Sequence, residues 1–217
     1  MSTIQEINKT QSWQHSRIPI HMHSAYRKIL HLIDKMPAGR ILEVGCHEGD
    51  FLDVLKSRGW YVKGLEIQAK SKEYIIEHDA SLPFPIKEKF DVVLAVEVIE
   101  HIVDTEAFLV NCKDALNKNG LFIVTTPNLL FWVNRIRMFF GLYPLFAYAD
   151  HHVRMFIWKD LKEKINKHFE IHKFFGTHVF MGIRHTRAFI VFSLLADIFP
   201  RLSAHFIVVA KKKSIDR

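Results

Sequence analysis

Acidic residues and glycines occur together in the segment ILEVGCHEGDF, residues 41–51, in a pattern suited to binding a small ligand. Glu43 lies inside an apolar run, Gly45 ends that run, and Gly49 follows four residues later. Glycine permits a tight turn and lets a ligand approach the backbone closely. The carboxylates in this segment would repel a phosphate, whereas a ligand with a cation or with hydroxyl groups would tolerate them.

Other side chains that can do chemistry follow the later apolar runs. Glu66, Asp79 and Glu97 each stand where such a run ends, and His101 comes four residues after the last of them. Histidine is the usual general base near pH 7, and a base helps whenever an oxygen or nitrogen must lose a proton as it reacts. Taken alone, Glu66 would more often be a solvated strand end and Asp79 the start of a turn, so only their place in a series gives them weight.

These residues must be positioned by the elements between them. Short runs rich in valine, isoleucine and leucine alternate with amphipathic segments, which predicts a parallel sheet covered by helices on both faces, an α/β fold. Ligands of such sheets bind at the carboxyl ends of the strands. The predicted strands are 40–44, 60–67, 73–79, 90–96, 121–127, 170–177 and 204–212, and the predicted helices are 24–36, 49–59, 105–120 and 158–169.

A dinucleotide is the usual ligand at the first glycine turn of such a sheet. Dinucleotide sites prefer the pattern G-x-G-x-x-G, in which bare backbone receives the pyrophosphate at a helix N-terminus. Here Gly45 and Gly49 are four residues apart, and His47 occupies the position of the middle glycine. The spacing and the acidic loop therefore argue against a nicotinamide oxidoreductase, which stays open as an alternative.

Four segments in series resemble the motifs of class I S-adenosylmethionine-dependent methyltransferases, most closely the quinone-biosynthesis type. They are LEVGCHEG, LEI, HDASLPF and FDVVLAVEVIEHI, and the resemblance covers residues 40–127. It implies a Rossmann-like, seven-stranded, mostly parallel sheet whose last strand is antiparallel. It also implies a single methyltransferase domain over residues 1–217, with S-adenosylmethionine as the cofactor.

The resemblance assigns parts of the cofactor to particular residues. Carboxylates would serve its polar groups, Glu43 and Glu97 at the methionine end, Glu66 at the ribose hydroxyls and Asp79 at the adenine amino group. The remaining cofactor-binding positions are Gly45, Cys46, His47, Gly49, Ile67 and Ala80. Because the family usually has glycine at position 47, a catalytically inactive binding protein with the same fold remains an alternative.

The same resemblance suggests catalytic and acceptor-binding residues. Family members carry Glu-His at the position of His101, which would act as the base or else cap the following helix. The segment DHHVRMFIWKDL, residues 150–161, resembles an H-x-R-x-F segment of bacterial methyltransferases. His152 and Arg154 would close over the acceptor or bind an acidic group on it, or else hold an ordered loop. The histidines lack zinc-like spacing to cysteines or carboxylates, so no metal site is predicted.

Composition limits the class of protein. The chain has 217 residues, of which 49% are hydrophobic, enough for one domain with a core. Its two cysteines, Cys46 and Cys112, fit a reducing compartment, and no secretory signal is recognisable, so a cytoplasmic location is expected. No apolar stretch approaches the roughly 20 residues that a membrane-spanning helix needs.

Charge is unevenly distributed along the chain. Residues 127–217 hold 15 Lys and Arg against 6 Asp and Glu, whereas residues 1–126 hold 15 against 17. Two segments in the basic half, 128–150 and 177–204, are apolar insertions that we expect on the acceptor side, and residues 1–23 are expected to form a loose arm. The insertions contain Arg135, Arg137, Arg184, Arg187 and Arg201.

These insertions predict a small-molecule, sugar-linked or lipid-linked acceptor that is anionic or lies at an anionic membrane surface. A pair of helices that covers the sheet edge, or a dimer interface, would give the same pattern. Nucleic acid is not expected, because the basic residues are scattered and no RNA-binding module is visible. The oligomeric state and the atom that is methylated cannot be predicted.

Overall fold

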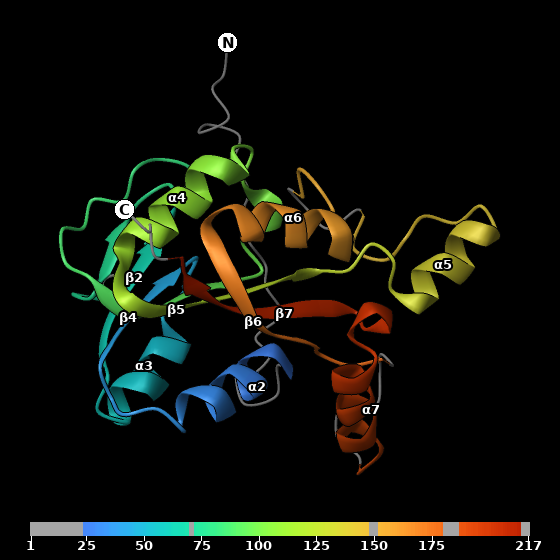
Figure 1. Cartoon of the computed structure of the whole chain (residues 1–217), viewed down its shortest axis with the longest axis horizontal. Helices are drawn as coiled ribbons and strands as arrows, with labels where there is room; N and C mark the ends of the chain where they lie inside the picture. The colour runs from blue at the N-terminus through green and yellow to red at the C-terminus, as the bar shows by residue number, and fades with distance from the viewer. Residues whose placement is uncertain (1–23, 70–71, 148–151, 180–186, 214–217) are drawn as a thin grey trace.

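A computed structural model describes residues 24–69, 72–147, 152–179 and 187–213, which contain a seven-stranded sheet (Figure 1). Its strands are β1 (Arg40–Val44), β2 (Tyr61–Glu66), β3 (Ile75–Glu77), β4 (Phe90–Val96), β5 (Leu116–Pro127), β6 (Phe169–Gly176) and β7 (His205–Lys212). In space they follow the order β3-β2-β1-β4-β5-β7-β6. Strand β7 is antiparallel to β5 and β6, and the remaining pairs are parallel. The predicted α/β fold with an antiparallel last strand is confirmed.

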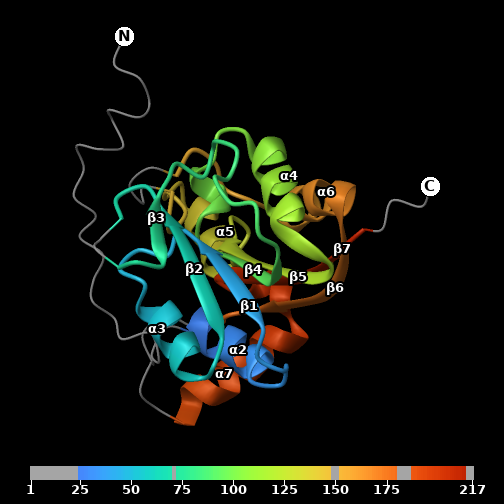
Figure 2. The ribbon, with the colours of Figure 1, turned by 90° about the vertical axis from the view of Figure 1, so that its left-hand side faces the viewer.

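Helices cover both faces of this sheet (Figures 1 and 2). Helices α2 (Ser24–Ile33) and α3 (Asp50–Ser57) pack on one face, where Ile29 and Phe51 belong to one buried apolar cluster. Helices α4 (Thr105–Ala115) and α6 (Trp158–His168) pack on the other, where Phe108 and Leu161 belong to a second cluster. The strands between them are buried from both sides, which explains their continuous apolar runs.

The strand order brings the acidic strand ends together. Strand β1 lies between β2 and β4, and all three run parallel, so their carboxyl ends meet at one edge of the sheet. Glu43 pairs in register with Gly64 of β2 and Leu94 of β4. The order of the strands reverses at β1, and such a switch point is where an open α/β sheet offers a crevice to a ligand.

The predicted boundary between the helix at 105–120 and the strand at 121–127 was wrong. Helix α4 ends at Ala115, and β5 begins at Leu116, which pairs with Phe90 before the register shifts. A side chain at Gly120 would meet the carbonyl oxygen of Phe90 at 3.1 Å. Gly120 therefore serves a close approach of two strands, although in the sequence it looks like a glycine that ends a helix.

Other predicted elements were found with different ends or lie outside the described residues. The strand predicted at 73–79 is reduced to the three residues of β3. The arm at 1–23 is outside the described residues, as are 148–150 and 180–186 within the two insertions, and so are the side chains of Arg184 and Arg187. The insertions contain α5 (Trp132–Phe139), α7 (Arg187–Ile198) and the 3-10 turn η3 (Pro200–Leu202), and a further 3-10 turn, η2 (Ile99–His101), follows β4.

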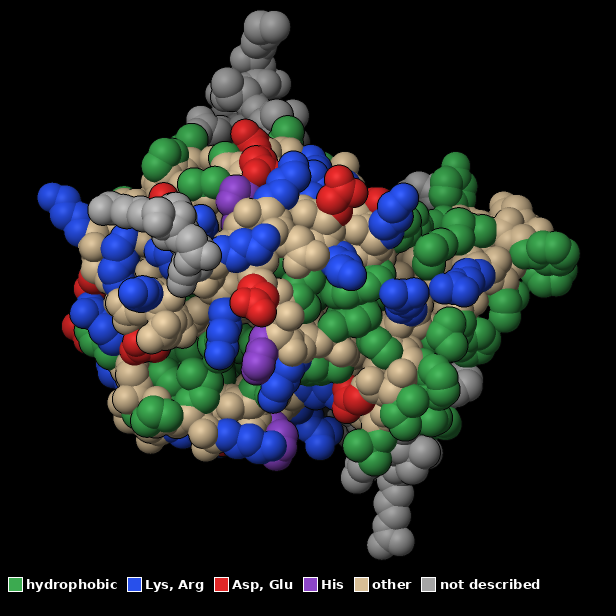
Figure 3. Space-filling view, viewed as in Figure 1, with side chains coloured by type: hydrophobic (Ala, Val, Ile, Leu, Met, Phe, Trp, Pro, Cys, Tyr) green, Lys and Arg blue, Asp and Glu red, His purple; other side chains and the backbone are tan. Residues whose placement is uncertain are grey.

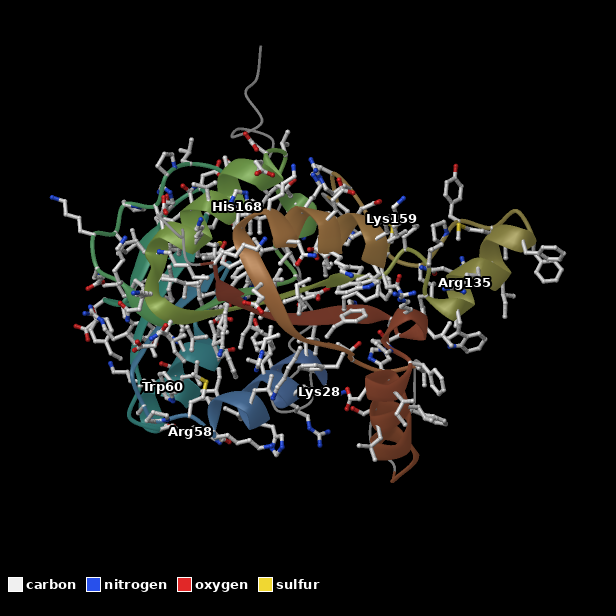
Figure 4. The ribbon with its side chains drawn as sticks, viewed as in Figure 1. Lys28, Arg58, Trp60, Arg135, Lys159 and His168 are labelled. Atoms are coloured by element: carbon white, nitrogen blue, oxygen red, sulfur yellow. The ribbon has the colours of Figure 1, made fainter. Side chains whose placement is uncertain are left out.

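A partly buried lysine connects α2 to the second insertion. Lys28 points from α2 toward α7 (Figure 4), and its ammonium donates to the carbonyls of Gly176 (2.7 Å) and Ser193 (2.9 Å). It also forms an ion pair with Asp197 at 2.5 Å. These three contacts satisfy all three ammonium donors, so the position of α7 against β6 is fixed by polar contacts as well as by packing.

Candidate active site

The loop between β1 and α3 is built on three residues with positive φ. Gly45 has φ +72°, His47 +51° and Gly49 +74°. The Gly45 N–H donates to the carbonyl of Leu65 at 2.8 Å, and the Gly49 N–H donates to the carbonyl of Cys46 at 2.8 Å. Histidine enters the left-handed region more easily than most residues, and here it takes the conformation that a glycine would otherwise supply.

Both glycines of this loop are also required by close contacts. A Cβ at Gly45 would lie 2.4 Å from Cγ2 of Val98, and a Cβ at Gly49 would lie 2.7 Å from Cδ1 of Ile75. Separations below 3.0 Å do not occur between real atoms of this kind. The loop backbone is therefore pressed against the start of the segment after β4 and against β3, and any side chain would displace it.

Cys46 contributes only its main chain to the crevice. Its side chain is buried, with its sulfur 2.4 Å from the position that a Cβ on Gly64 would take. Burial raises the pKa of the Cys46 thiol, so the group stays protonated at neutral pH. A ligand at this loop would therefore meet the backbone of residue 46 and not its side chain.

Glu43 is fully buried at the end of β1, and the described residues satisfy only one of its oxygens. The Tyr26 hydroxyl donates to Oε1 at 3.1 Å, whereas Oε2 has no hydrogen-bond partner in the described part of the chain. Burial, assisted by the negative charge of Glu66, raises the pKa of the Glu43 carboxyl to about 8. Because buried polar atoms are almost always paired, the orphaned oxygen marks a place where a ligand's donor fits.

Glu66, at the end of β2, holds the glycine loop from the other side. Its Oε2 accepts from the His47 N–H at 2.7 Å, and its Oε1 accepts from the Ile67 N–H at 2.9 Å. Each carboxylate oxygen can accept a second hydrogen bond, so two hydroxyl groups of a ribose can still be bound. The carboxylate is thus already oriented by the backbone that surrounds it.

Asp79 forms a turn at the position that was assigned to the adenine. Its Oδ1 accepts from the Ser81 N–H at 2.9 Å, and its carbonyl accepts from the Leu82 N–H at 3.0 Å. Ala80, between them, is partly buried against the apolar cluster that contains Phe108. The contact of Asp79 and Ala80 with adenine stays a prediction, because the turn alone would also account for the aspartate.

Glu97 directly follows β4 in a strained conformation, with φ +56°. Its backbone N–H and its carboxylate both contact Thr125, the latter through a hydrogen bond of 2.5 Å from the threonine hydroxyl to Oε1. Its Oε2 lies 3.4 Å from Nε2 of His205. Non-glycine residues with positive φ occur disproportionately at functional sites, and this one lies at the carboxyl edge of the sheet beside the glycine loop.

The structure brings together the two histidines singled out in the sequence. The rings of His101 and His152 contact each other edge to face, with centroids 4.7 Å apart, and Nδ1 of His152 lies 3.0 Å from the carbonyl of Phe146. The buried Glu100 completes the cluster, and one polar atom from each of Glu100, His101 and His152 lies within 4.8 Å of the others. These distances suit a shared proton or a shared cation, a grouping that sequence spacing alone could not show.

Within this cluster, Glu100 is a buried carboxyl with a perturbed pKa. Its Oε2 accepts from the Thr126 hydroxyl at 3.0 Å, and its Oε1 has no hydrogen-bond partner among the described residues. Burial, together with the nearby charge of Glu97, raises the pKa of the Glu100 carboxyl well above its usual value. A neutral carboxylic acid beside His152 is therefore expected at neutral pH.

Arg154 makes its visible contacts with the protein itself. Its guanidinium donates to the Thr105 hydroxyl at 3.0 Å and to the carbonyl of Val103, and its backbone N–H donates to the carbonyl of Glu100 at 3.3 Å. These bonds connect Arg154 to residues 100–105, which span η2 and the start of α4. Contact between Arg154 and the acceptor stays a prediction beside this structural role.

Sequence reasoning missed four residues that touch the predicted site. Tyr26 contacts Glu43, Thr125 and His205 contact Glu97, and Oε1 of Glu100 lies 4.0 Å from Nε2 of His152. Glu100 stands beside His101 in the motif and could have been noticed there. The other contacts join residues between 17 and 108 positions apart, and no local pattern in the sequence marks them.

Most of the chain is similar to known methyltransferases. A family model described as a methyltransferase domain matches residues 18–168. The ubiquinone biosynthesis O-methyltransferase of Bradyrhizobium diazoefficiens is 34% identical over 101 aligned positions, and the alignment covers 41% of this chain and 40% of that protein. The match thus spans well under half of that curated relative.

Solved methyltransferase structures share the fold over nearly the whole chain. A SAM-dependent methyltransferase from Thermotoga maritima superimposes with a TM-score of 0.61 at 19% identity, covering 89% of this chain and 92% of that one. The N-methyltransferase NodS of Bradyrhizobium japonicum, solved with S-adenosylhomocysteine, gives a TM-score of 0.59 at 11% identity and covers 97% of both chains. At these identities the likeness concerns the fold alone.

Proposed function

The chain belongs to the methyltransferase-domain family, and from this premise we propose that it is an S-adenosylmethionine-dependent methyltransferase. Its acceptor is an oxygen or nitrogen atom of a small-molecule, sugar-linked or lipid-linked compound that carries negative charge. The free thiols of Cys46 and Cys112 are compatible with work in the cytoplasm, which we include in the proposal.

One observation carries this proposal, namely the orphaned Oε2 of Glu43 beside the glycine loop. A fully buried carboxylate oxygen that has no partner among the described residues fits the ammonium of the cofactor's methionine part. The Gly45 backbone fits the same part, since a turn at φ +72° without a side chain lets a ligand approach the main chain closely. Carboxylates also fit a cationic cofactor better than they fit a pyrophosphate.

The residues present suggest how the cofactor would be held. Glu66 would accept from both ribose hydroxyls, Asp79 would accept from the adenine amino group, and Glu97 would line the methionine end. When bound, the cofactor supplies a methyl group on a sulfonium, which is a good leaving group. Much of the catalysis can then come from holding the acceptor in line with that methyl group.

The histidine cluster would take the proton that the acceptor loses. His101 lies just beyond β4, at the edge of the sheet where the methyl group is expected, and its ring touches His152. A carbonyl contact at Nδ1 of His152 orients that ring. We assign proton acceptance to His101, with His152 beside it at the acceptor, and this assignment is supported by the contact between the rings.

Binding of the cofactor is the direct test of the proposed activity. We expect S-adenosylhomocysteine to raise the melting temperature of the protein by several degrees and NADH to leave it unchanged, because a ligand that binds only the folded state stabilises it. Incorporation of a labelled methyl group from S-adenosylmethionine into a panel of anionic acceptors then tests turnover. Stabilisation by NADH alone would contradict the proposal.

The inactive alternative rests on His47, and a glycine at this position tests it. Because His47 already has φ +51° and its N–H already bonds Glu66, His47→Gly is expected to change the affinity for S-adenosylhomocysteine by no more than about threefold. Isothermal titration calorimetry measures the change. A gain of tenfold or more would mean that the histidine obstructs the site, which would favour the inactive binding protein.

The acceptor side of the molecule carries an exposed apolar surface. At the end of α5 the exposed fractions of Phe139, Phe140 and Tyr143 are 85%, 70% and 63%. Hydrophobic side chains gather over this part of the molecule (Figure 3), and residues 128–147 include two arginines and no acidic residue. Among the described residues, no helix is both long and apolar enough to cross a bilayer. This surface is consistent with peripheral contact to an anionic membrane.

Vesicle binding tests this contact. We expect the protein to sediment with phosphatidylglycerol vesicles more than with phosphatidylcholine vesicles, and less as salt is raised. Phe139→Glu should reduce sedimentation by about tenfold, since it puts a charge where an aromatic ring would enter the interface. Val103→Glu, at another exposed apolar residue (54%), serves as the control. Equal partitioning of all variants, with no effect of salt, would remove the membrane from the proposal.

A further inference from the structure

Tyr26, which lies in α2 and outside the motif series, contacts the carboxylate at the centre of the predicted cofactor site. Its hydroxyl donates to Oε1 of Glu43 at 3.1 Å. Its ring packs on Phe51, the second residue of α3, with centroids 4.6 Å apart. Because Ala25 and Ile29 are fully buried on the same helix, the position of the hydroxyl is fixed by the packing of α2 against α3 and β1.

This contact decides which oxygen of Glu43 faces a ligand. With Oε1 held by Tyr26, the unpartnered Oε2 is the oxygen left for a donor that enters the crevice. A buried carboxylate with one neutral hydrogen bond is poorly solvated, so without a cation it is more stable as the neutral acid. A cationic ligand that reaches Oε2 reverses this balance, because its charge favours the carboxylate form.

We propose that Tyr26 is a positioning residue for the cofactor, and that the Tyr26–Glu43 pair holds a proton that is released when the cofactor's ammonium binds. The inference rests on the proposed function and deepens it. In the exchange, neutral Glu43 and the ligand ammonium give an ion pair at Oε2, and the carboxyl proton leaves to solvent. Tyr26 remains a hydroxyl throughout, since burial and the charge of Glu43 raise its pKa well above 10.0.

The electrostatic surroundings support this exchange. Among the described residues, the ionisable groups that act on the pair are Glu66 from β2, Glu97 from beyond β4 and Cys46 from the loop, and all of them are acidic. Burial and the charge of Glu66 raise the pKa of Glu43 to about 8, whereas the Tyr26 hydrogen bond lowers it. At pH 7 Glu43 is therefore mostly protonated, and it stays so at any lower pH.

The direction of the pH dependence follows from this value. Binding needs the carboxylate, so the apparent affinity is highest above pH 8 and falls as pH decreases through the pKa of free Glu43. With a pKa of about 8, the dissociation constant at pH 7 is roughly tenfold that of the deprotonated form, and it rises about another tenfold by pH 6. One proton should be released for nearly every ligand bound at pH 7.

The experiment titrates the full-length protein with S-adenosylhomocysteine in a calorimeter at pH 6 to 8.5. Phosphate and Tris buffers have different ionisation enthalpies, so the difference in heat counts the protons released. We expect close to one proton for the wild type at pH 7 and none for Glu43→Gln, whose affinity should not change across this pH range. If Glu43 served stability alone, Glu43→Gln would release as many protons on binding as the wild type does.

Tyr26→Phe keeps the ring that packs on Phe51 and removes only the hydroxyl. Without the hydrogen bond the pKa of Glu43 should rise by about one unit. The variant should then bind roughly tenfold more weakly than wild type at pH 7 and only about threefold more weakly at pH 8.5. Tyr61→Phe, at an exposed tyrosine on the far end of β2, is the matched control and should bind as wild type does.

The outcomes separate the two proposals. Tight binding of S-adenosylhomocysteine with fewer than about 0.2 protons released at pH 7 would overturn this inference and leave the proposed function intact. The same holds if Tyr26→Phe matches Tyr61→Phe at every pH. Failure of the wild type to bind S-adenosylhomocysteine at any pH would remove both.

Discussion

Replacing Gly45 with alanine is expected to weaken the binding of S-adenosylhomocysteine by about 100-fold. The backbone at this position has φ +72°, which costs an alanine roughly 1–2 kcal/mol. The new Cβ would also lie 2.4 Å from Cγ2 of Val98, and overpacking of this kind costs about 1–3 kcal/mol. Together these costs destabilise the binding conformation of the loop by about 2–5 kcal/mol. Every 1.4 kcal/mol corresponds to a tenfold change in affinity.

Gly141 offers a matched control for the strain alone. It has φ +69°, close to that of Gly45, but no atom lies within 4 Å of the position of its Cβ. Gly141→Ala should therefore lower the free energy of unfolding by about 1 kcal/mol and leave ligand affinity unchanged. Calorimetry and urea unfolding on both variants separate the two effects. If Gly45→Ala still bound within threefold of wild type, the loop would not approach the ligand as we suppose.

Replacing Glu66 with glutamine is expected to weaken S-adenosylhomocysteine binding by about 30- to 150-fold. Glu66 accepts at both oxygens, from His47 on one side and Ile67 on the other. Glutamine has only one acceptor oxygen, so its NH₂ group must face one of these N–H donors. The loss of a charged hydrogen bond and of the bond to the ribose amounts to about 2–3 kcal/mol.

Glu77 provides the control for the loss of charge. It pairs in register with Glu66 on the neighbouring strand, but its side chain is exposed. Glu77→Gln should therefore leave the affinity and the melting temperature close to those of wild type. Equal affinities of Glu66→Gln and Glu77→Gln would place the ribose elsewhere and would undermine the arrangement of carboxylates on which the proposed function depends.

Most of the fold could be predicted because parallel strands that are buried on both faces consist of continuous apolar runs. Strands 40–44 and 90–96 were predicted with the ends that the structure gives them. The end of α4 was predicted wrongly because Gly120 looks like a glycine that ends a helix. In the structure Asn117 bonds Asp91 at 2.7 Å, a tertiary contact that turns the chain back toward the sheet.

In the candidate site, too, the residues in local sequence patterns could be predicted and those brought in by tertiary packing could not. The glycine loop and the acidic strand ends are local patterns, and the chain order of an α/β sheet brings them to one edge. Tyr26 and His205 reach the same edge from α2 and from the start of β7, and neither belongs to a motif. Their roles depend on which side chain of an ordinary element faces inward at one position, and only the packed structure decides that.

The arrangement of acidic strand ends around an adenosyl group is the central claim, and a crystal structure with S-adenosylhomocysteine tests it most directly. We predict that the ligand's ammonium lies within hydrogen-bond distance of Oε2 of Glu43, and that both ribose hydroxyls bond to Glu66. A complex in which the nucleoside binds away from these two carboxylates, or in which Oε2 of Glu43 remains without a partner, would contradict the claim.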